Sequence, residues 1–484
     1  MSNQPSIKKN FIYSSAYQML IVLAPFITAP YISRVLGADG IGIQSYTQSI
    51  QQYFLIFAAL GTRSYGEREI SINRNDLYKR SKLFWEMELM VVCTTSLALL
   101  GWLSLILCSS KYTIYYIVLS IGIFAGMFDI SWFFNGIEQF KITVIRNSFF
   151  KILGIICLFV FIKSPEDLAL YILIQMVSNL LSNLSLWLYI KRYLVKVNPK
   201  EFKFKRHFHE TLIYFIPTIA TSIYTVLDKT LIGLITDNAS QNGYYQQAEK
   251  IINLAKSVVF AAINSVVGVR NSYLFSENRY EEIHYKIKQS FNFIFFAGFA
   301  CCFGIMGVAK TFVPLFFGPG YAPVVEIIYV FSPIIVIIGI SDCLGSQYYN
   351  PIGKRKQSAK FLIVGSFVNL CLNLVLIPKF GAYGAAIASV IAESVISVLY
   401  VKFSEGYGRV RLLIETGAKK LIAGVGMFFV VYSMNRLHIN SLILVFLEVI
   451  VGAVVYGLLL LFLRDEWIYE MFKSVIGKMR KYNG

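Results

Sequence analysis

Residues 210–236 read ETLIYFIPTIATSIYTVLDKTLIGLIT, an apolar run that carries two adjacent charges, Asp228 and Lys229, in its interior. A transmembrane helix needs about 20 consecutive, predominantly apolar residues. Charged side chains inside a membrane are costly, and they mark sites of pairing or of function. The stretch therefore predicts a membrane-spanning helix whose charges need partners.

The composition of the whole chain agrees with this stretch. Of its 484 residues, 56% are hydrophobic and 15% are charged, and the mean hydropathy is +0.60. A soluble domain usually carries about 25% charged residues. The composition predicts an all-α polytopic membrane protein, and no segment outside the membrane is long enough to bury a core of its own.

Apolar runs of membrane-spanning length recur along the chain, and we count about fourteen of them. Prolines interrupt the first run (Pro25 and Pro30) and the seventh (Pro217). The predicted spans lie near residues 11–34, 41–62, 83–107, 112–134, 145–162, 167–190, 210–236, 243–268, 289–309, 324–347, 359–378, 383–401, 417–434 and 441–463.

Lys and Arg are distributed unevenly between the two sides of these spans. With the N-terminus in the cytoplasm, most of the 45 basic residues fall in cytoplasmic segments such as 63–82, 135–151 and 191–208. The outer side holds Arg34, Lys111, Lys163, Lys310, Lys379 and Arg436. This positive-inside bias predicts an even number of spans with both termini in the cytoplasm. The net charge of +18 therefore reflects topology, and no nucleic-acid partner is expected.

Two segments that open predicted spans resemble each other. GIQSYTQSI (Gly42–Ile50) and GYYQQAEKI (Gly243–Ile251) share a glycine, a run of tyrosine and glutamine, and a closing isoleucine. Internal repeats are common in transporters. We predict two six-helix lobes related by a pseudo-twofold axis, plus two extra helices. The corresponding segments are residues 1–208 (N-terminal lobe and cytoplasmic linker), 209–405 (C-terminal lobe) and 406–484 (the last two helices and a cytoplasmic tail).

The chain carries no motif for a metal, a nucleotide or a disulfide framework. Its seven cysteines lie in or beside apolar runs without ligand spacing, and its four histidines show no metal spacing. The GxxGxG sequence at Gly37–Gly42 follows a predicted span, and there is no Walker A motif. We therefore expect no cofactor and no metal. The predicted outer loops are short, which argues against a membrane glycosyl-transfer enzyme.

Four stretches resemble one family of exporters. They are YISRVLGADGIGIQSY with YFLIFAALGTRSYGEREI (residues 31–70), WFFNGIEQFKITVIRNSFFK (132–151), FIPTIATSIYTVLDKTLIG with GYYQQAEKI (215–251), and NLVLIPKFGAYGAAIASVIAE (373–393). They resemble the Wzx-type repeat-unit flippases of bacterial capsule and O-antigen synthesis, which belong to the multidrug/oligosaccharidyl-lipid/polysaccharide exporter superfamily.

The resemblance implies a fold, a substrate and a location. It implies two lobes around a central cavity, alternating access, and an oligosaccharide carried on a polyprenyl pyrophosphate. The expected location is the bacterial cytoplasmic membrane. The expected partners are this lipid-linked oligosaccharide, membrane lipids, and the polysaccharide polymerase with its chain-length machinery.

Polar side chains within or beside the spans are the candidates for the cavity. A pyrophosphate-linked sugar needs cations near its phosphates and amides or hydroxyls along its sugars. On span 243–268, Glu249, Asn253 and Lys256 follow helical spacing and share one face. The candidate substrate-binding residues are Lys256, Lys250, Arg34, Arg63, Asn253, Gln48 and Gln52, with Gln44, Gln51, Gln246 and Gln247 as further amides. For Arg34 and Arg63 a second interpretation is equally good: each lies at a helix end, where a basic side chain extends to the membrane–water interface.

Asp228, Lys229 and Glu249 are the candidates for charge pairing or gating. Neighbours on a helix point about 100° apart, so Asp228 does not pair neatly with Lys229. We expect pairing across the hairpin, Asp228 with Lys250 or Lys229 with Glu249, either as structural support or as part of the cavity. Asp129, Asp342, Glu393 and Glu448 also lie in or near spans, and each is a candidate for a proton or sodium site.

These observations predict a flippase that moves lipid-linked oligosaccharide units by alternating access, without catalysing a reaction. Two alternatives stay open. A lipid II flippase would differ only in its substrate. A drug or cation antiporter of the same superfamily should carry a buried acidic site and few lysines in its cavity.

Overall fold

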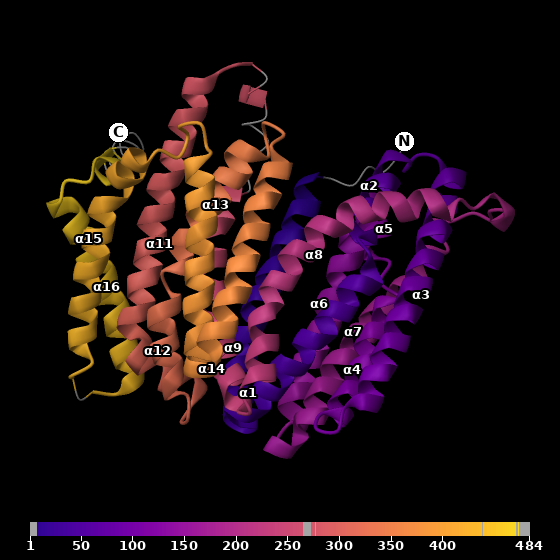
Figure 1. Cartoon of the computed structure of the whole chain (residues 1–484), viewed down its shortest axis with the longest axis horizontal. Helices are drawn as coiled ribbons and strands as arrows, with labels where there is room; N and C mark the ends of the chain where they lie inside the picture. Colours follow the sequence, from indigo (N-terminus) through magenta and orange to yellow (C-terminus); the bar gives the residue numbers. More distant parts are fainter. Residues whose placement is uncertain (1–6, 265–272, 276, 438, 471–472, 474–484) are drawn as a thin grey trace, which may run out of the picture. The chain divides into compact units, whose positions relative to one another are not determined.

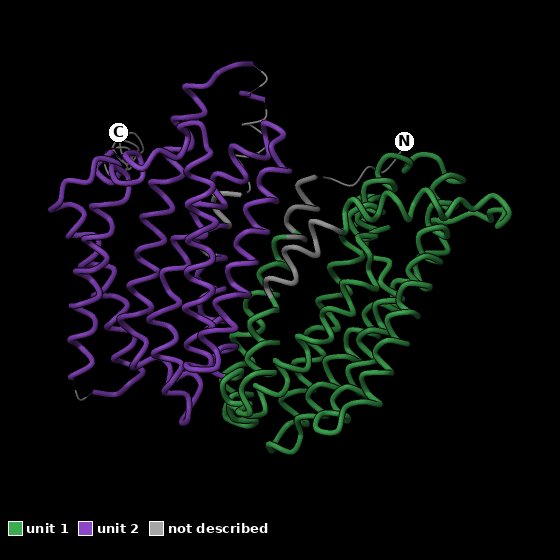
Figure 2. Tube along the Cα trace, in the orientation of Figure 1, with its two compact units in different colours: residues 1–243 green, residues 244–484 purple. Residues whose placement is uncertain are grey.

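The computed structural model describes residues 7–264, 273–275, 277–437, 439–470 and 473, and these residues form helices and no strand. The all-α prediction is confirmed. The chain divides into two compact units, residues 1–243 and 244–484 (Figure 2). The predicted lobe boundaries, at residues 208 and 405, stay a prediction.

Unit 1 is a bundle of long helices joined by short ones (Figure 1). Within it α4 and α6 pack against α7, and α1 packs against α3 and α8. Local sequence explains where some helices begin. The Asp76 carboxylate caps α3 by accepting from the Lys79 amide at 3.0 Å, and Ser164 with Pro165 opens the entry to α7. The elements are α1 (Ile7–Ala59), α2 (Thr62–Ile72), α3 (Leu77–Cys108), α4 (Thr113–Gly126), α5 (Ser131–Gly136), α6 (Phe140–Phe161), η1 (Pro165–Asp167), α7 (Leu168–Ile190), η2 (Pro199–Glu201), α8 (Phe204–Ile235) and the start of α9 (Ala239–Asn264).

Unit 2 is built around α11, which packs against α12, α13, α15 and α16. Four phenylalanines of α11 recur every four residues and stack along one face: Phe291, Phe295, Phe299 and Phe303. This spacing places one ring on each turn of the helix. The elements are the remainder of α9, α11 (Tyr280–Phe317), α12 (Ala322–Phe331), α13 (Ile334–Leu344), η3 (Gly345–Tyr349), α14 (Arg355–Lys402), α15 (Val410–Met434) and α16 (Ser441–Phe462).

Nine helical segments in the described part of the chain are long and apolar enough to cross a membrane. Two of them, residues 15–72 and 355–402, each contain two of the predicted spans. The spans predicted near 210–236, 243–268 and 417–434 are not among the nine, although α8, α9 and α15 occupy them. Residues 265–268 lie outside the described residues. The protein is an integral membrane protein, and fourteen crossings stay a prediction.

The prolines do not interrupt their helices, which corrects the sequence analysis. α1 continues through Pro25 and Pro30 and breaks at Gly37, where φ is 67° and ψ is 178°. α8 runs from Phe204 to Ile235 without a break at Pro217. α14 likewise breaks at Gly381, with φ 55° and ψ −131°. Only glycine adopts such positive φ values at little cost, whereas transmembrane helices tolerate proline.

The two sequence repeats contact each other through their glycines. A Cβ added to Gly42 would lie 1.8 Å from the Ala239 carbonyl oxygen, and one added to Gly243 would lie 2.1 Å from the Ala38 carbonyl oxygen. The Ser240 hydroxyl donates to Asp39, a residue 201 positions earlier, which is also the spacing of the two glycines. The contact between these two segments is therefore reciprocal.

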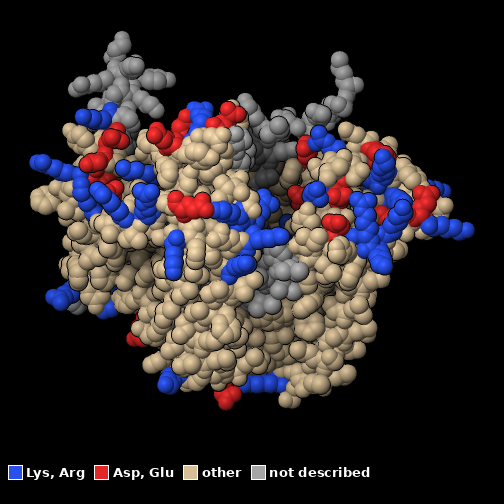
Figure 3. Space-filling model, turned by 45° about the horizontal axis from the view of Figure 1, so that its top comes forward, with Lys and Arg blue, Asp and Glu red and all other residues tan. Residues whose placement is uncertain are grey.

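Charged side chains are unevenly distributed over the surface. In the space-filling view, Lys, Arg, Asp and Glu crowd the upper part of the face shown, while the area below it is almost free of charge (Figure 3). A bilayer-embedded bundle needs such an apolar zone.

Candidate functional site

A polar cavity of about 530 Å³ lies within unit 1. This cavity is called the polar cavity below. It is bounded by α1, α6 and α7, by Arg63 at the start of α2, and by Asp129 and Ser131 at the junction of α4 and α5. Its lining residues are Tyr17, Ile21, Arg63, Asp129, Ser131, Arg146, Asn147, Phe150, Lys151, Gly154, Ile155, Leu158, Ile174, Gln175, Met176, Ser178, Asn179, Ser182 and Asn183.

Two helices supply the polar wall of this cavity. On α7 the polar residues are Gln175, Ser178, Asn179, Ser182 and Asn183, which follow a spacing of three to four residues. Residues at this spacing share one face of a helix. The α6 helix adds Asn147 and Lys151 by the same rule. Polar residues of α6 and α7 thus form one wall of the polar cavity.

Arg146 is the fixed cation of the cavity. Its side chain is buried, and its guanidinium donates to the Ser182 carbonyl of α7 and to the Asn147 side chain. These bonds hold the charge between α6 and α7. Its Nε is buried and has no hydrogen-bond partner among the described residues.

Two further cations, Arg63 and Lys151, line the cavity with exposed side chains. Asp129 is the only acid among the lining residues, and its Oδ1 accepts from the Ser131 amide at 3.0 Å. Its charge acts on Arg146. Three cations face one carboxylate, so the lining carries a net positive charge that favours an anionic ligand.

A group of amides joins the cavity wall to α1. Gln48 donates to the Gln175 Oε1 at 3.3 Å, and Gln44 reaches the same oxygen at 3.4 Å. Amides in such a row offer both donors and acceptors to hydroxyl groups. Gln51 differs, because it is buried and donates to the Leu119 carbonyl at 2.7 Å beside Gly122. Gln51 therefore belongs to the packing between helices rather than to a binding site.

An apolar cleft of about 220 Å³ adjoins the polar cavity between α6 and α7. The cleft and the cavity share Phe150, Gly154, Ile174 and Ser178. At this seam a Cβ on Gly154 would lie 3.0 Å from the Ser178 Oγ. The Ser178 hydroxyl donates to the Phe150 carbonyl at 2.7 Å. The remaining lining residues of the apolar cleft are Leu153, Cys157, Leu173, Val177 and Leu181.

The predicted substrate-binding residues divide between this cavity and other places. Arg63 lines the polar cavity, and Gln48 contacts it through Gln175. Arg34 is exposed on α1, where its guanidinium donates to the Pro30 carbonyl at 3.0 Å. Gln52 is exposed on the same helix. These two do not line the polar cavity.

The remaining candidates lie on α9 in unit 2. Asn253 is exposed, whereas Lys250 and Lys256 are half-buried. The polar cavity lies in unit 1, so its lining gives no information on whether these three residues bind substrate. Their role in substrate binding stays a prediction.

The predicted pairing residues lie on α8 and α9. Asp228 is 5% exposed and acts electrostatically on Tyr53 of α1. The Lys229 carbonyl accepts from the Asn242 side chain at 2.7 Å, while Glu249 is half-buried. The expected pairs, Asp228 with Lys250 and Lys229 with Glu249, stay predictions.

Sequence reasoning missed the residues that define this cavity. It placed Arg146 and Lys151 in a cytoplasmic segment, 135–151, but α6 begins at Phe140 and carries both. The polar stripe of α7 was not singled out either. The three-to-four-residue spacing from Gln175 to Asn183 is the sequence signal that identifies it.

Comparison with known proteins supplies the family. A family model described as polysaccharide biosynthesis protein matches residues 7–267, more than half of the chain. A candidate O-antigen transporter of Escherichia coli is 24% identical over 407 residues, which cover 83% of this chain and 97% of that protein. A candidate O-antigen transporter of Shigella dysenteriae is 24% identical over 411 residues, 82% of this chain and 99% of that protein.

Among solved structures, the lipid II flippase MurJ in its inward closed conformation matches with a TM-score of 0.70 at 18% identity. The match covers 94% of this chain and 99% of that chain. At this identity the likeness establishes the fold alone. The family resemblance found in the sequence is confirmed, and the chain belongs to the polysaccharide biosynthesis protein family.

Proposed function

We propose that the protein is a flippase that moves polyprenyl-pyrophosphate-linked oligosaccharide repeat units across the cytoplasmic membrane, for capsule, O-antigen or another surface polysaccharide. One observation carries this proposal. A cationic, amide-rich cavity meets an apolar cleft at a narrow seam, Gly154 and Ser178. An amphiphile with an anionic head and a hydrocarbon chain fits this combination.

The polar cavity suits the head group of such a substrate. Guanidinium groups bind phosphate oxygens in a bidentate manner, and Arg146 is already oriented by Ser182 and Asn147. Arg63 and Lys151 add charge without a fixed geometry. The amides of Gln175 and Asn179 face sugar hydroxyls in this arrangement.

The apolar cleft suits the lipid chain next to the head group. Apart from Ser178, whose hydroxyl donates to the Phe150 carbonyl, its lining residues are apolar, and Leu153 and Leu181 are exposed along it. A hydrocarbon chain in contact with these side chains stays in an apolar environment while the pyrophosphate leaves the membrane. A purely hydrophilic substrate would gain nothing from the cleft.

We propose alternating access of two lobes, residues 1–208 and 209–405, as the transport mechanism, with residues 406–484 as an added pair of helices. Lys250, Lys256, Asn253, Arg34 and Gln52 are proposed to extend the binding path beyond the polar cavity. Asp228, Lys229 and Glu249 are proposed to pair or to gate the movement. The mechanism includes no catalytic step and no cofactor.

The proposed setting is the bacterial cytoplasmic membrane, with both termini in the cytoplasm. Its supports are the positive-inside charge pattern of the sequence and the gathering of charge on the upper part of the face shown in Figure 3. A polysaccharide polymerase and the chain-length machinery are the proposed protein partners, because they would use the units delivered to the outer leaflet.

The proposal is tested by reconstituting the full chain in vesicles that contain a lipid-linked oligosaccharide on one leaflet. The expected result is movement of the oligosaccharide to the other leaflet at a rate that falls in the Arg146→Gln variant. Lipid II and a cationic drug serve as competing substrates. Movement of lipid II alone, or of the drug alone, would overturn the assignment in favour of the corresponding alternative.

A further inference from the structure

Glu448 is a fully buried acid inside unit 2. Its side chain is 0% exposed, and it is the only charged residue of α16. Its Oε1 lies 3.0 Å from the Thr311 hydroxyl oxygen of α11, whereas its Oε2 is buried and has no hydrogen-bond partner among the described residues. An ionised carboxylate in such surroundings is strongly unfavourable, and an acid within a membrane span points to a function. The function proposed above makes no use of this residue.

Thr311 lies between Glu448 and Asn435, which ends α15. The Thr311 hydroxyl oxygen is 2.8 Å from Asn435 Oδ1 and 3.0 Å from Glu448 Oε1. A hydroxyl group has one proton to donate, and its oxygen accepts through two lone pairs. Thr311 therefore donates to only one of these two oxygens, and the other contact needs a proton from a different group.

The orientation of the Asn435 amide decides which oxygen receives the Thr311 proton. Asn435 Nδ2 donates to the Tyr432 carbonyl at 3.0 Å and to the Gly307 carbonyl at 3.4 Å. Turning the amide over would place its oxygen against both carbonyls, which are acceptors only. The hydrogen-bond network thus fixes Oδ1 on the side of Thr311, where it accepts the Thr311 proton.

The contact between Thr311 and Glu448 then lacks a proton unless Glu448 carries it. A carboxylate oxygen at 3.0 Å would face a hydroxyl oxygen whose only proton is already donated. As a carboxylic acid, Glu448 donates to Thr311, Thr311 donates to Asn435, and Asn435 donates to the Tyr432 carbonyl. A neutral acid also explains why Oε2 is tolerated without a partner, because the cost of burying an unpaired charge is absent.

The basic group nearest in the sequence to Thr311 is engaged elsewhere. Lys310 is exposed, and its Nζ donates to the Tyr432 hydroxyl at 2.7 Å and lies 4.5 Å from the centre of the same ring. No ion pair joins Lys310 to Glu448 among the described residues. Arg436, after the end of α15, is exposed as well. A countercharge that would keep Glu448 ionised is therefore not supplied by either group.

The helices packed against α16 carry their other charges far from this site. α16 packs against α11 and α15 (Figure 1). On α16 itself, the Tyr456 hydroxyl donates to the Phe296 carbonyl at 2.9 Å. The other charged or imidazole side chains of α11 and α15 all lie in the first half of each helix, about four or more turns from Thr311 and Asn435. They are Glu281, Glu282, His284, Lys286 and Lys288 of α11, and Arg411, Glu415, Lys419 and Lys420 of α15.

We propose that Glu448 holds a proton at neutral pH, in a site that it forms with Thr311 and Asn435 where α11, α15 and α16 meet. The separations of 2.8 and 3.0 Å between the three oxygens are those of hydrogen bonds, so a proton fits between each pair. The ligand of the site is thus a proton and not a metal ion.

The proton fastens two helices to α11 at once. Without it, the Thr311 hydroxyl either turns to the Glu448 carboxylate and gives up Asn435, or stays on Asn435 and leaves the carboxylate without a donor. The contacts of α11 with α15 and with α16 at this point are therefore both kept only while the site is protonated. This inference goes beyond the proposed function and does not rest on it.

Infrared spectroscopy of the full chain in detergent tests for the proton. The expected result at neutral pH is a carbonyl band of a carboxylic acid that is lost in Glu448→Gln and kept in Glu326→Gln, whose side chain on α12 is exposed. If Glu448→Gln loses no such band, the proposal is overturned. It is also overturned if the band is present in choline chloride and disappears in sodium chloride, because a metal ion then occupies the site.

Thr311→Val tests the hydrogen-bonded site, including the case in which Glu448→Gln does not fold. Valine has nearly the shape of threonine and accepts no hydrogen bond, so the band is expected to shift to higher frequency while the proton is retained. A band at unchanged frequency would overturn the site. If neither variant folds, the wild-type spectrum decides: the absence of any carboxylic acid band at neutral pH overturns the proposal, and a band that is lost at alkaline pH supports it.

Thermal unfolding gives a readout that a merely structural acid would not change. A proton that folded Glu448 holds and the unfolded chain releases makes the fold less stable as the pH rises above neutral. The unfolding midpoint is therefore expected to fall more steeply from neutral to alkaline pH in the wild type than in Glu448→Gln. Parallel curves for the two proteins would overturn the proposal.

Discussion

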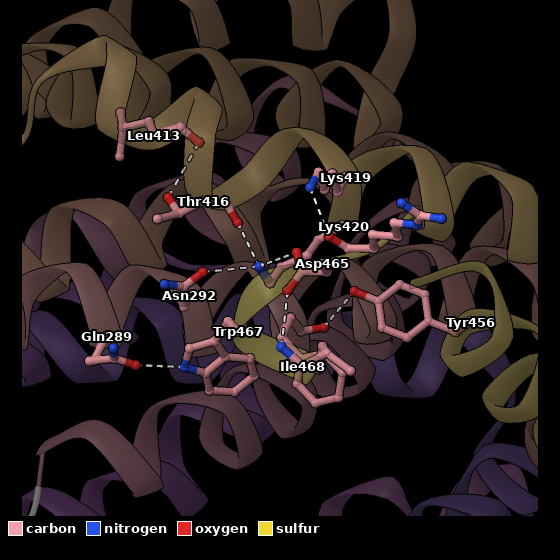
Figure 4. A network of polar contacts seen from close by, with 12 residues as sticks. Gln289, Asn292, Leu413, Thr416, Lys419, Lys420, Tyr456, Asp465, Trp467 and Ile468 are labelled. Carbon is pink, nitrogen blue, oxygen red and sulfur yellow. Dashed lines mark hydrogen bonds and ion pairs between the residues drawn. The ribbon is translucent and has the colours of Figure 1, made fainter. Parts of the chain in front are cut away.

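The ammonium group of Lys420 lies 2.8 Å from the carboxylate of Asp465, and both side chains are almost fully buried, at 1% and 5% exposure (Figure 4). Lys420 also donates to the Asn292 side chain at 3.0 Å and to the Thr416 carbonyl at 2.9 Å. The contacts join α15, α11 and the segment that follows α16. Trp467 in that segment donates to Gln289 of α11 at 2.6 Å, so the segment contacts α15 through Asp465 and α11 through Trp467.

Breaking this buried pair is expected to destabilise unit 2. Lys420→Met removes the cation and leaves the Asp465 carboxylate buried without a countercharge, which typically costs about 3–5 kcal/mol. Thermal unfolding in detergent measures the loss. The double variant Lys420→Met/Asp465→Leu should recover much of it, because it removes both charges. The control is Arg411→Met on the same helix, whose exposed pair with Glu415 contributes about 0.5 kcal/mol or less. Equal losses in Lys420→Met and Arg411→Met would contradict the structural role.

Neutralising a cavity cation is expected to weaken transport without unfolding the protein. Lys151→Gln removes a charge from the polar cavity, and the loss of one charge-assisted contact corresponds to roughly a tenfold fall in affinity for a lipid-linked oligosaccharide. Lys141→Gln is the matched control, because Lys141 lies on the same helix and does not line the cavity. Substrate binding and leaflet transfer in vesicles provide the measurement. If substrate affinity fell by a similar factor in both variants, the effect would come from the overall charge of α6 and not from a contact in the polar cavity.

The contact between the sequence repeats is expected to tolerate no side chain. Gly42→Ala places a Cβ against the Ala239 carbonyl, a clash with backbone that no rotamer relieves, and we expect a loss of about 3 kcal/mol. Gly457→Ala on α16 is the control, since a Cβ there meets nothing within 4 Å and alanine favours the helix by about 1 kcal/mol. Unfolding midpoints of the two variants should therefore shift in opposite directions. An unfolding midpoint that Gly42→Ala leaves unchanged would show that the two segments separate freely.

An acid-dependent contact lies just beyond the end of α14. Hydrogen bonds from Lys354 and Tyr348 hold the pKa of the Glu405 carboxyl below its ordinary value of 4.5. Because the pKa is lowered in the folded protein, the contact stabilises the fold fully at pH values above about 4.5. This stabilisation is lost as the pH falls through the lowered pKa. The effect is expected to be small because the Glu405 side chain is 65% exposed. Unfolding midpoints measured across this pH range should fall less steeply in Glu405→Gln than in the wild type. Parallel curves would contradict the role of this carboxylate.

Apolar runs and charge placement predicted much of the fold, because both follow directly from the cost of polar groups in a bilayer. The spans near 145–162 and 167–190 correspond to α6 and α7. The sites where long helices break could not be read in the same way. Pro30 has the stronger local signal, yet the break falls at Gly37, since packing decides where the backbone leaves helical geometry.

The candidate site was predicted in part. Arg63 and Gln48 were selected as polar groups beside spans, and the first lines the polar cavity while the second contacts it. Arg146 was missed because basic residues near a span end are normally assigned to the cytoplasmic side. Only the pairing of α6 with α7 shows that its guanidinium reaches the Ser182 carbonyl instead.

The reciprocal contact between the repeats also has a genetic consequence. The groups that press on Gly42 and Gly243 are the carbonyls of Ala239 and Ala38, which every amino acid carries. If a larger residue at Gly42 or Gly243 causes a defect, no substitution at Ala239 or Ala38 can therefore relieve it. Suppressor mutations of such a defect should map elsewhere along α1, α8 or α9, at positions that let a whole helix shift.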